Sequence, residues 1–215
     1  MSMTLWEAKN IMGRRIIGPE ELHAIGANLG IAPPSGVPPL IPWSRDELKK
    51  RSRDSLLILG VPYGKNGKKL TLITLRSHFG CDPKKKEPCF YHQDWYLNEK
   101  FARETVLEPR WYILRTSVEE SSRGKSPDDI VVSLRERDNL PPAVLTAFAF
   151  FAHYFLTKGE LLWKNDFVWC ADTDSNDDRI YTGRYCDPQG VNKDGFNIHR
   201  QLSIRSCYGV APMQI

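Results

Sequence analysis

The sequence predicts an α+β fold, with strand-like segments near both ends of a set of helices. Segment 55–61 has the apolar composition of a buried strand, and segment 110–118 alternates as a strand does. Residues 143–156 form an apolar run of helical length, and from Phe167 to Ile215 short strand-like segments alternate with polar turns. Because the strands cluster instead of alternating regularly with helices, we expect an α+β class and not a parallel βαβ fold.

The first helices are predicted from their starting residues. Thr4 and Glu7 have the spacing of a capping box, which predicts a helix from Leu5 to about Met12. A second helix is expected to begin at Pro19, a residue suited to the first helical turn, and to run towards Gly30.

A proline-rich connector follows these helices. Five prolines between Ala32 and Pro42 exclude regular structure there. Ser44 and Glu47 then form a second capping box, so a short basic helix should extend to about Arg53. Residues 1–54 are therefore predicted to be an N-terminal helical segment with a Pro-rich connector.

The remainder, residues 55–215, is predicted to be an α+β domain, with one continuous domain for the whole chain as the alternative. Ser55–Val61 and Leu70–Leu75 are expected to form a hairpin around a turn at 65–67. A helix is expected from Leu97 to about Glu104, and a strand from Arg110 to Val118.

The apolar run is predicted to be a buried helix from Pro141 to Lys158, ended by Gly159. It is too short to cross a bilayer, so we expect no membrane association. The charged segment Pro127–Leu140 gives no clear prediction.

The C-terminal region should form one antiparallel sheet. Within it Phe196 and Ile198 alternate with Asn197 and His199, which predicts one packed face and one polar face. The polar face is the candidate binding site. The predicted strands are 167–170, 179–185, 196–204 and 208–212, with Trp169, Tyr181, Phe196 and Val210 facing the core.

Composition favours an ordinary globular protein, because 41% of the 215 residues are hydrophobic and 26% are charged. The N-terminus lacks the apolar core of a signal peptide, so we expect a cytoplasmic location. Five cysteines are an odd and sparse set that suits free thiols in a reducing compartment. A Cys170–Cys186 disulfide is the alternative for an oxidising compartment.

The net charge of +4 is modest, and the basic runs Lys49–Arg53 and Lys84–Lys86 are short. No aromatic residues are interleaved with them to stack on bases, so nucleic acid is not the expected partner.

Two segments have metal-like spacing. Two imidazoles and two thiols, His78, Cys81, Cys89 and His92, have the donor types of a tetrahedral zinc site. Alternating oxygen donors, Asp172, Asp174, Asn176 and Asp178, resemble the start of a calcium loop. That match fails at its sixth and twelfth positions, which are Asp177 and Gly183. We favour ordinary loop residues in the first case and a polar turn in the second, and we predict no metal or other cofactor.

No catalytic constellation is evident. The candidate catalytic residues, His92 with Asp94 and His153 in the apolar helix, are isolated from one another in the sequence. No common nucleophile, phosphate-loop, zinc-protease or dinucleotide motif occurs. We therefore assign no catalytic residue and expect a protein that is not an enzyme.

Five segments together resemble a family of uncharacterised bacterial proteins. They are IMGRRIIGPEEL, IPWSRDELKKRSRDSLLILGV, FYHQDWYLNEKFA, RWYILRTSVEESSRGKS, and the tail RIYTGRY with DGFNIHRQLSIRSCYGVAP. The tail resembles the end of a C-type-lectin fold, as found in the variable target proteins of diversity-generating retroelements.

The resemblance implies a protein whose C-terminal positions vary while the core strands persist. The cysteines of a formylglycine-generating enzyme are not present, which counts against that chemistry. The positions that the resemblance assigns to the variable binding stretch are Asn197, His199, Arg200, Gln201, Ser203, Arg205, Ser206 and Tyr208.

The leading functional hypothesis is a non-enzymatic protein of C-type-lectin-like fold that binds a macromolecule, expected to be a protein, through its C-terminal face. The second is a metal-dependent enzyme that uses the Cys/His segment 78–92. The third is a nucleic-acid-associated protein that uses the basic runs.

Overall fold

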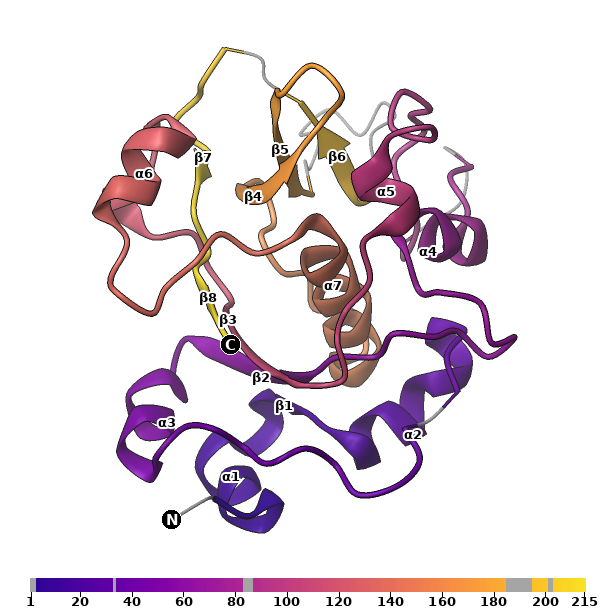
Figure 1. Cartoon of the computed structure of the whole chain (residues 1–215), viewed down its shortest axis with the longest axis vertical. Coiled ribbons are helices and arrows are strands. Elements are labelled where there is room, and N and C mark those ends of the chain that lie inside the picture. Colours follow the sequence, from indigo (N-terminus) through magenta and orange to yellow (C-terminus); the bar gives the residue numbers. More distant parts are fainter. Residues whose placement is uncertain (1–2, 33, 83–86, 185–194, 201–202) are drawn as a thin grey trace.

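The computed structural model describes residues 3–32, 34–82, 87–184, 195–200 and 203–215. In this part of the chain, two four-stranded sheets lie on either side of the central helix α7 (Ala143–Thr157) (Figure 1). The other helices are α1 (Leu5–Met12), α2 (Pro19–Leu29), α3 (Arg45–Arg51), α4 (Leu72–Phe79), α5 (Lys100–Glu104), α6 (Pro127–Ser133) and the 3₁₀ turns η1 (Gly13–Arg15) and η2 (Glu120–Ser122). This mixed architecture confirms the α+β class.

The first sheet has the order β1-β2-β3-β8. Its strands are β1 (Ile16–Ile17), β2 (Ser55–Leu59), β3 (Trp111–Arg115) and β8 (Met213–Gln214). β1 is parallel to β2, and the other two pairings are antiparallel. Both predicted segments, 1–54 and 55–215, thus contribute strands to the same sheet and residues to the same core.

The predicted helix starts are confirmed for α1, α2 and α3. The hydroxyl of Thr4 accepts a hydrogen bond from the backbone N–H of Glu7 at 3.3 Å, and Ser44 does the same for Glu47 at 3.3 Å. α2 ends at Gly30, whose left-handed φ of 68° is readily adopted by glycine.

The predicted hairpin is wrong. Residues 64–68 do turn, with the Gly64 N–H donating to the Lys68 carbonyl at 2.8 Å, but the chain then enters helix α4 instead of a strand. The Thr71 hydroxyl caps this helix, and Leu72, Leu75 and Phe79 are buried. The partners of β2 are β1 and β3.

The middle of the chain differs from the prediction mainly at element boundaries. α5 begins at Lys100 instead of Leu97, and β3 ends at Arg115 instead of Val118. Segment 127–140, which was too charged for a prediction, starts with helix α6, capped by the Ser126 hydroxyl.

Helix α7 is apolar and packs against α2, α4 and the strands β4 and β5 of the second sheet. Phe148, Phe150 and Phe151 are fully buried, and the helix ends at Lys158 in a left-handed conformation. No helix of the described residues is long and apolar enough to span a membrane.

The second sheet has the order β6-β5-β4-β7. Its strands are β4 (Phe167–Thr173), β5 (Arg179–Gly183), β6 (Asn197–His199) and β7 (Tyr208–Gly209). All four predicted core residues are buried: Trp169, Tyr181, Phe196 and Val210.

The prediction of a wholly antiparallel second sheet is wrong at one pairing. β7 runs parallel to β4, with Phe167 opposite Tyr208. β6 is also shorter than the predicted strand 196–204, because the described residues after His199 form an irregular turn. Tyr185, at the end of another predicted strand, lies outside the described residues.

Candidate functional site

The second sheet is buried on both faces. Val168, Ile180 and Ile198 belong to the main core that includes α7. The opposite face forms a second hydrophobic cluster with Ile130 of α6. This aromatic cluster consists of Phe167, Trp169, Tyr181 and Tyr208, together with Ile130, Leu140 and Val210.

The aromatic rings of this cluster are closely packed. The Tyr181 and Tyr208 ring centroids are 4.6 Å apart, and the Trp169 and Tyr181 centroids are 5.1 Å apart at nearly right angles. The two tyrosine hydroxyls are 3.4 Å apart, and burial raises the pKa of Tyr181. Such packing fixes the sheet and the segments attached to it.

Two residues of the predicted binding stretch are therefore interior. Asn197 is 3% exposed and its amide donates to the Gly195 carbonyl at 3.0 Å, while Tyr208 is 5% exposed in the aromatic cluster. Strand alternation was correctly predicted, but the face expected to meet solvent is covered by α6 and the residues after it. The expectation that Asn197 and Tyr208 are solvent-facing is wrong.

His199 lies at the edge of the aromatic cluster and is partly exposed. Its ring stacks on Tyr181 with centroids 5.6 Å apart, and the Gln93 amide nitrogen is 3.1 Å from His199 Nε2. Burial lowers the pKa of His199, so the neutral ring is favoured near pH 7.

Arg200 is held in place on the surface. Its guanidinium donates to Asp174 Oδ2 at 3.0 Å and lies 5.2 Å from the centre of the Trp95 ring. The Trp95 indole N–H donates in turn to the Ile198 carbonyl at 3.1 Å. A planar cation in a fixed position can present its remaining N–H donors to a partner.

Ser203, Arg205 and Ser206 are exposed in the turn that leads into β7. The Tyr208 N–H donates to the Arg205 carbonyl at 3.0 Å, and the Phe167 N–H donates to the Cys207 carbonyl at 2.9 Å. This turn lies at the top of Figure 1, beyond the end of β7. Gln201, also predicted to bind, lies outside the described residues.

We define the tail surface as the residues of the predicted stretch that are at least partly exposed: His199, Arg200, Ser203, Arg205 and Ser206. Sequence reasoning missed the supporting residues Gln93, Trp95 and Asp174. The sequence shows no signal for Gln93 or Trp95, because they come from a loop about a hundred residues earlier in the chain.

The described structure does not bring the four Cys/His residues together as a set of metal ligands. The His78 ring contacts the Asn28 carbonyl through Nε2 at 2.7 Å, Cys89 is buried, and His92 is exposed. The part of the chain that the structure describes contains no group of three or more His, Cys, Asp or Glu side chains that could hold a metal ion.

The calcium-like residues act in turn and helix capping. Asp174 Oδ1 accepts from the N–H groups of Asn176 and Asp178, and Asp172 Oδ2 accepts from the N–H of Ala143 at the start of α7. Burial opposes ionisation of Asp174, but its bonds to Arg200 and to the backbone outweigh this effect and lower its pKa.

Asp94 and His153, two of the scattered polar residues, lie beside other charged side chains. Asp94 pairs with Arg76, and His153 lies 3.8 Å from Glu160 at the surface of α7. Burial lowers the pKa of His153. Cys186, the suggested disulfide partner of Cys170, and the lysine run 84–86 lie outside the described residues.

Comparison of the chain with protein-family models, with curated proteins and with solved structures found no match in any of the three.

Proposed function

We propose that the protein is a non-enzymatic binding protein that recognises another protein through the tail surface. The observation that carries this proposal is the position of these polar residues at the edge of a sheet packed on both faces. Binding residues on a rigid scaffold can change without loss of the fold, as in other loop-based recognition proteins.

The charge of the tail surface supports a protein partner. Asp174 pairs with Arg200, and Arg205 adds a further positive charge in a stretch, 195–215, that contains no Asp or Glu. An acidic group on a partner would complement this surface. The neighbouring aromatic residues Trp169, Tyr181 and Tyr208 are buried and offer no stacking platform for bases. Arginine is also enriched at protein interfaces.

The proposal includes a C-type-lectin-like arrangement in which a diversity-generating retroelement varies the tail surface. Its support is the resemblance of the tail segments and the return of β8 to the first sheet, which leaves the turn 203–206 at the periphery. Burial narrows the variable set, because Asn197 and Tyr208 would not tolerate free substitution.

Sequencing many natural copies of the gene tests the variation. We expect substitutions to concentrate at Arg200, Ser203, Arg205 and Ser206 and to be rare at Asn197 and Tyr208. A reverse transcriptase gene and a near-identical template repeat of the 3′ coding region should lie nearby. Equal variation at buried and exposed positions would contradict this part of the proposal.

Site-specific photo-crosslinking in the native host tests recognition directly. A photoreactive residue at Ser206 should give a discrete protein adduct, because this position is exposed on the tail surface. The same residue at Lys65, exposed in the turn that precedes α4, is the control and should not give that adduct. The adduct should disappear when Arg200 and Arg205 are both replaced by Gln, and its persistence would contradict the proposal.

A further inference from the structure

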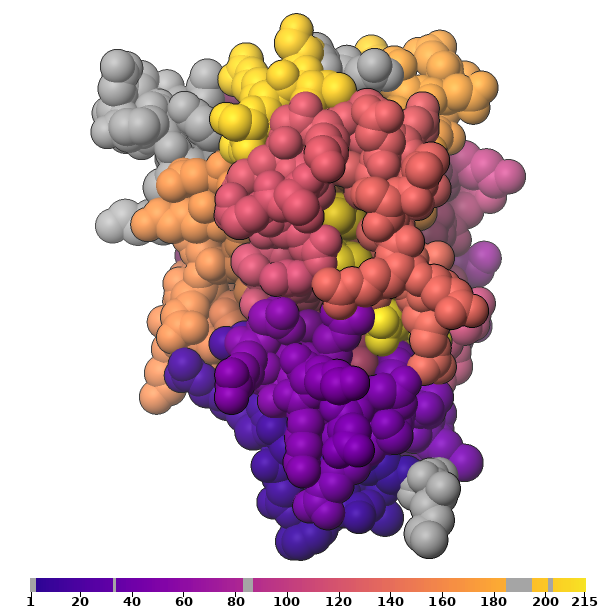
Figure 2. Space-filling view, turned by 90° about the vertical axis from the view of Figure 1, so that its left-hand side faces the viewer, coloured from indigo at the N-terminus to yellow at the C-terminus, as the bar shows by residue number. Residues whose placement is uncertain are grey.

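A second surface feature is rich in basic residues. It is a groove of about 360 Å³ at the meeting point of α3, the end of β3, the segment after α6, and β8. Figure 2 shows this side of the molecule, where yellow C-terminal atoms appear between the N-terminal part and the segment that includes α6. Five of its eight lining residues are cationic: Lys50, Arg51, Arg115, Arg135 and Arg137.

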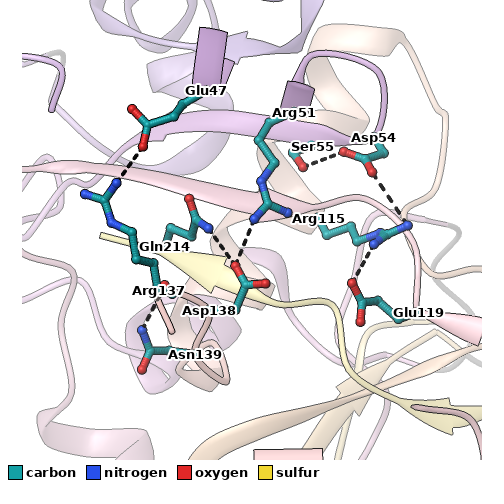
Figure 3. A network of polar contacts seen from close by, with 10 residues as sticks. All are labelled: Glu47, Arg51, Asp54, Ser55, Arg115, Glu119, Arg137, Asp138, Asn139 and Gln214. Atoms are coloured by element: carbon teal, nitrogen blue, oxygen red, sulfur yellow. Dashed lines mark hydrogen bonds and ion pairs between the residues drawn. The ribbon is translucent and has the colours of Figure 1, made fainter. Parts of the chain in front are cut away.

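Asp138 anchors one wall of this basic groove. Its carboxylate is buried, at 7% exposure, and accepts hydrogen bonds from Arg51 at 3.0 Å and from Gln214 at 2.6 Å (Figure 3). These contacts join α3, the segment after α6 and β8. They fix the Arg51 guanidinium at the groove.

Two other arginines are also positioned by carboxylates (Figure 3). Arg137 donates to Glu47 at 2.6 Å, and Arg115 donates to Glu119 at 2.6 Å, with Asp54 at 3.6 Å from its other terminal nitrogen. A guanidinium has five N–H donors, and the described side-chain contacts use one in Arg51 and one in Arg137. The Arg137 side chain is 56% exposed and can turn its remaining donors to a ligand, while Arg51 and Arg115 are mostly buried and can offer only part of theirs.

The charges in the groove do not balance. The lining includes two carboxylates, Glu47 and Asp54, against five cations. Asp138 and Glu119, which pair with Arg51 and Arg115, reduce the local excess to +1. Lys50 and Arg135 make no ion pair within the part of the chain that the structure describes. An anion that contacts both Lys50 and Arg135 would give these two cations a partner.

We propose that the basic groove binds the phosphate group of a small molecule. A phosphate monoester has a charge of about −1.5 to −2 at pH 7 and three acceptor oxygens, which suits several converging guanidinium donors. The volume is that of a small-ligand pocket. Glu47 and Asp54 lie at the same groove, so no continuous basic track for a nucleic acid backbone is present there. The inference is independent of the tail surface.

Calorimetric titration with inorganic phosphate and with glucose 6-phosphate, at constant ionic strength, tests the proposal. Glucose and a ten-nucleotide single-stranded DNA are the comparison ligands. The variant K50Q/R135Q removes two groove cations without leaving a carboxylate unpaired. The matched control K49Q/R53Q removes the same charge from exposed residues of the same region that do not line the groove.

We expect saturable binding of both phosphate ligands and none of glucose. Affinity should fall about tenfold or more in K50Q/R135Q, which corresponds to about 1.4 kcal/mol, and change less than about twofold in K49Q/R53Q. Binding of phosphate alone would identify the free ion as the ligand, and stronger binding of glucose 6-phosphate would identify a monoester.

Three results would overturn the inference: no saturable phosphate binding, equal loss of affinity in both double variants, or binding of the oligonucleotide without binding of phosphate. Equal loss would show that the general field of the protein, not the groove, attracts the anion. Thermal melting of both variants verifies that they are folded, since all four replaced side chains are exposed.

Discussion

Replacing Phe196 with alanine tests the packing of the C-terminal region. The ring is 1% exposed, and its centroid lies 5.0 Å from that of Phe150, 5.7 Å from that of Phe90 and 6.0 Å from that of Phe151. Removal of a phenylalanine ring from a filled core costs about 3 to 5 kcal/mol, since apolar contacts are lost and a cavity remains. With rings on several sides, the surroundings cannot collapse easily, and we expect about 4 kcal/mol.

For a chain of this length, 1 kcal/mol shifts the melting temperature by about 2 to 4 °C, so F196A should melt about 8 to 16 °C lower than the parent protein. Calorimetry and urea denaturation measure the change independently. The control is S203A/R205A/S206A, whose exposed side chains should contribute about 0.5 kcal/mol or less each. If this control unfolds while F196A is tolerated, the register of β6 is wrong by one residue.

Three further results are expected. Asp138→Ala should destabilise the protein by about 3 kcal/mol in urea denaturation, because Arg51 loses its buried partner; no change would refute the anchoring role. Because the folded-state pKa of His199 is lowered, its contribution to stability is present above about pH 6.5, the unfolded pKa, and is lost as pH falls through the folded pKa. The loss of melting temperature between pH 7 and 5 should therefore be smaller in His199→Gln, and equal slopes would contradict this. Elemental analysis should find no stoichiometric zinc; about one zinc per chain, bound by segment 78–92, would reopen the enzyme hypothesis.

Local signals in the sequence were sufficient for the first three helices. Thr4 with Glu7, and Ser44 with Glu47, form their capping boxes as expected because such contacts depend on only four neighbouring residues. The strand prediction for segment 70–75 was wrong because its β-branched residues are typical of strands. The Thr71 cap and the burial of Leu72, Leu75 and Phe79 at helical spacing were the stronger signal.

The composition of the C-terminal region predicted the strands of the second sheet. It did not predict which residues cover the second face of that sheet. Period-two alternation separates Asn197 and His199 from Phe196 and Ile198, yet it does not show what covers each face. Here Ile130 and Leu140 cover the second face, and both come from a charged segment that gave no prediction.

The basic groove was not predicted for a related reason. The run Lys49–Arg53 was predicted to belong to a short basic helix, and its exposed residues Lys49 and Arg53 do not line the groove. Arg115, Arg135 and Gln214 join Lys50 and Arg51 only through tertiary contacts between distant segments. No spacing rule applied to one segment could have grouped them.

The pairing of β8 with β3 affects how the chain folds during its synthesis. β3 ends at Arg115, but its second neighbour is not made until residues 213–214, after α7 and the whole second sheet. At about 5 to 20 residues per second, the ribosome needs about 5 to 20 s to make the intervening segment. During that interval one edge of β3 has no strand to pair with. The unpaired N–H and C=O groups of such an edge can form hydrogen bonds with another chain. The nascent protein should therefore be most prone to association until residues 213–214 have been made.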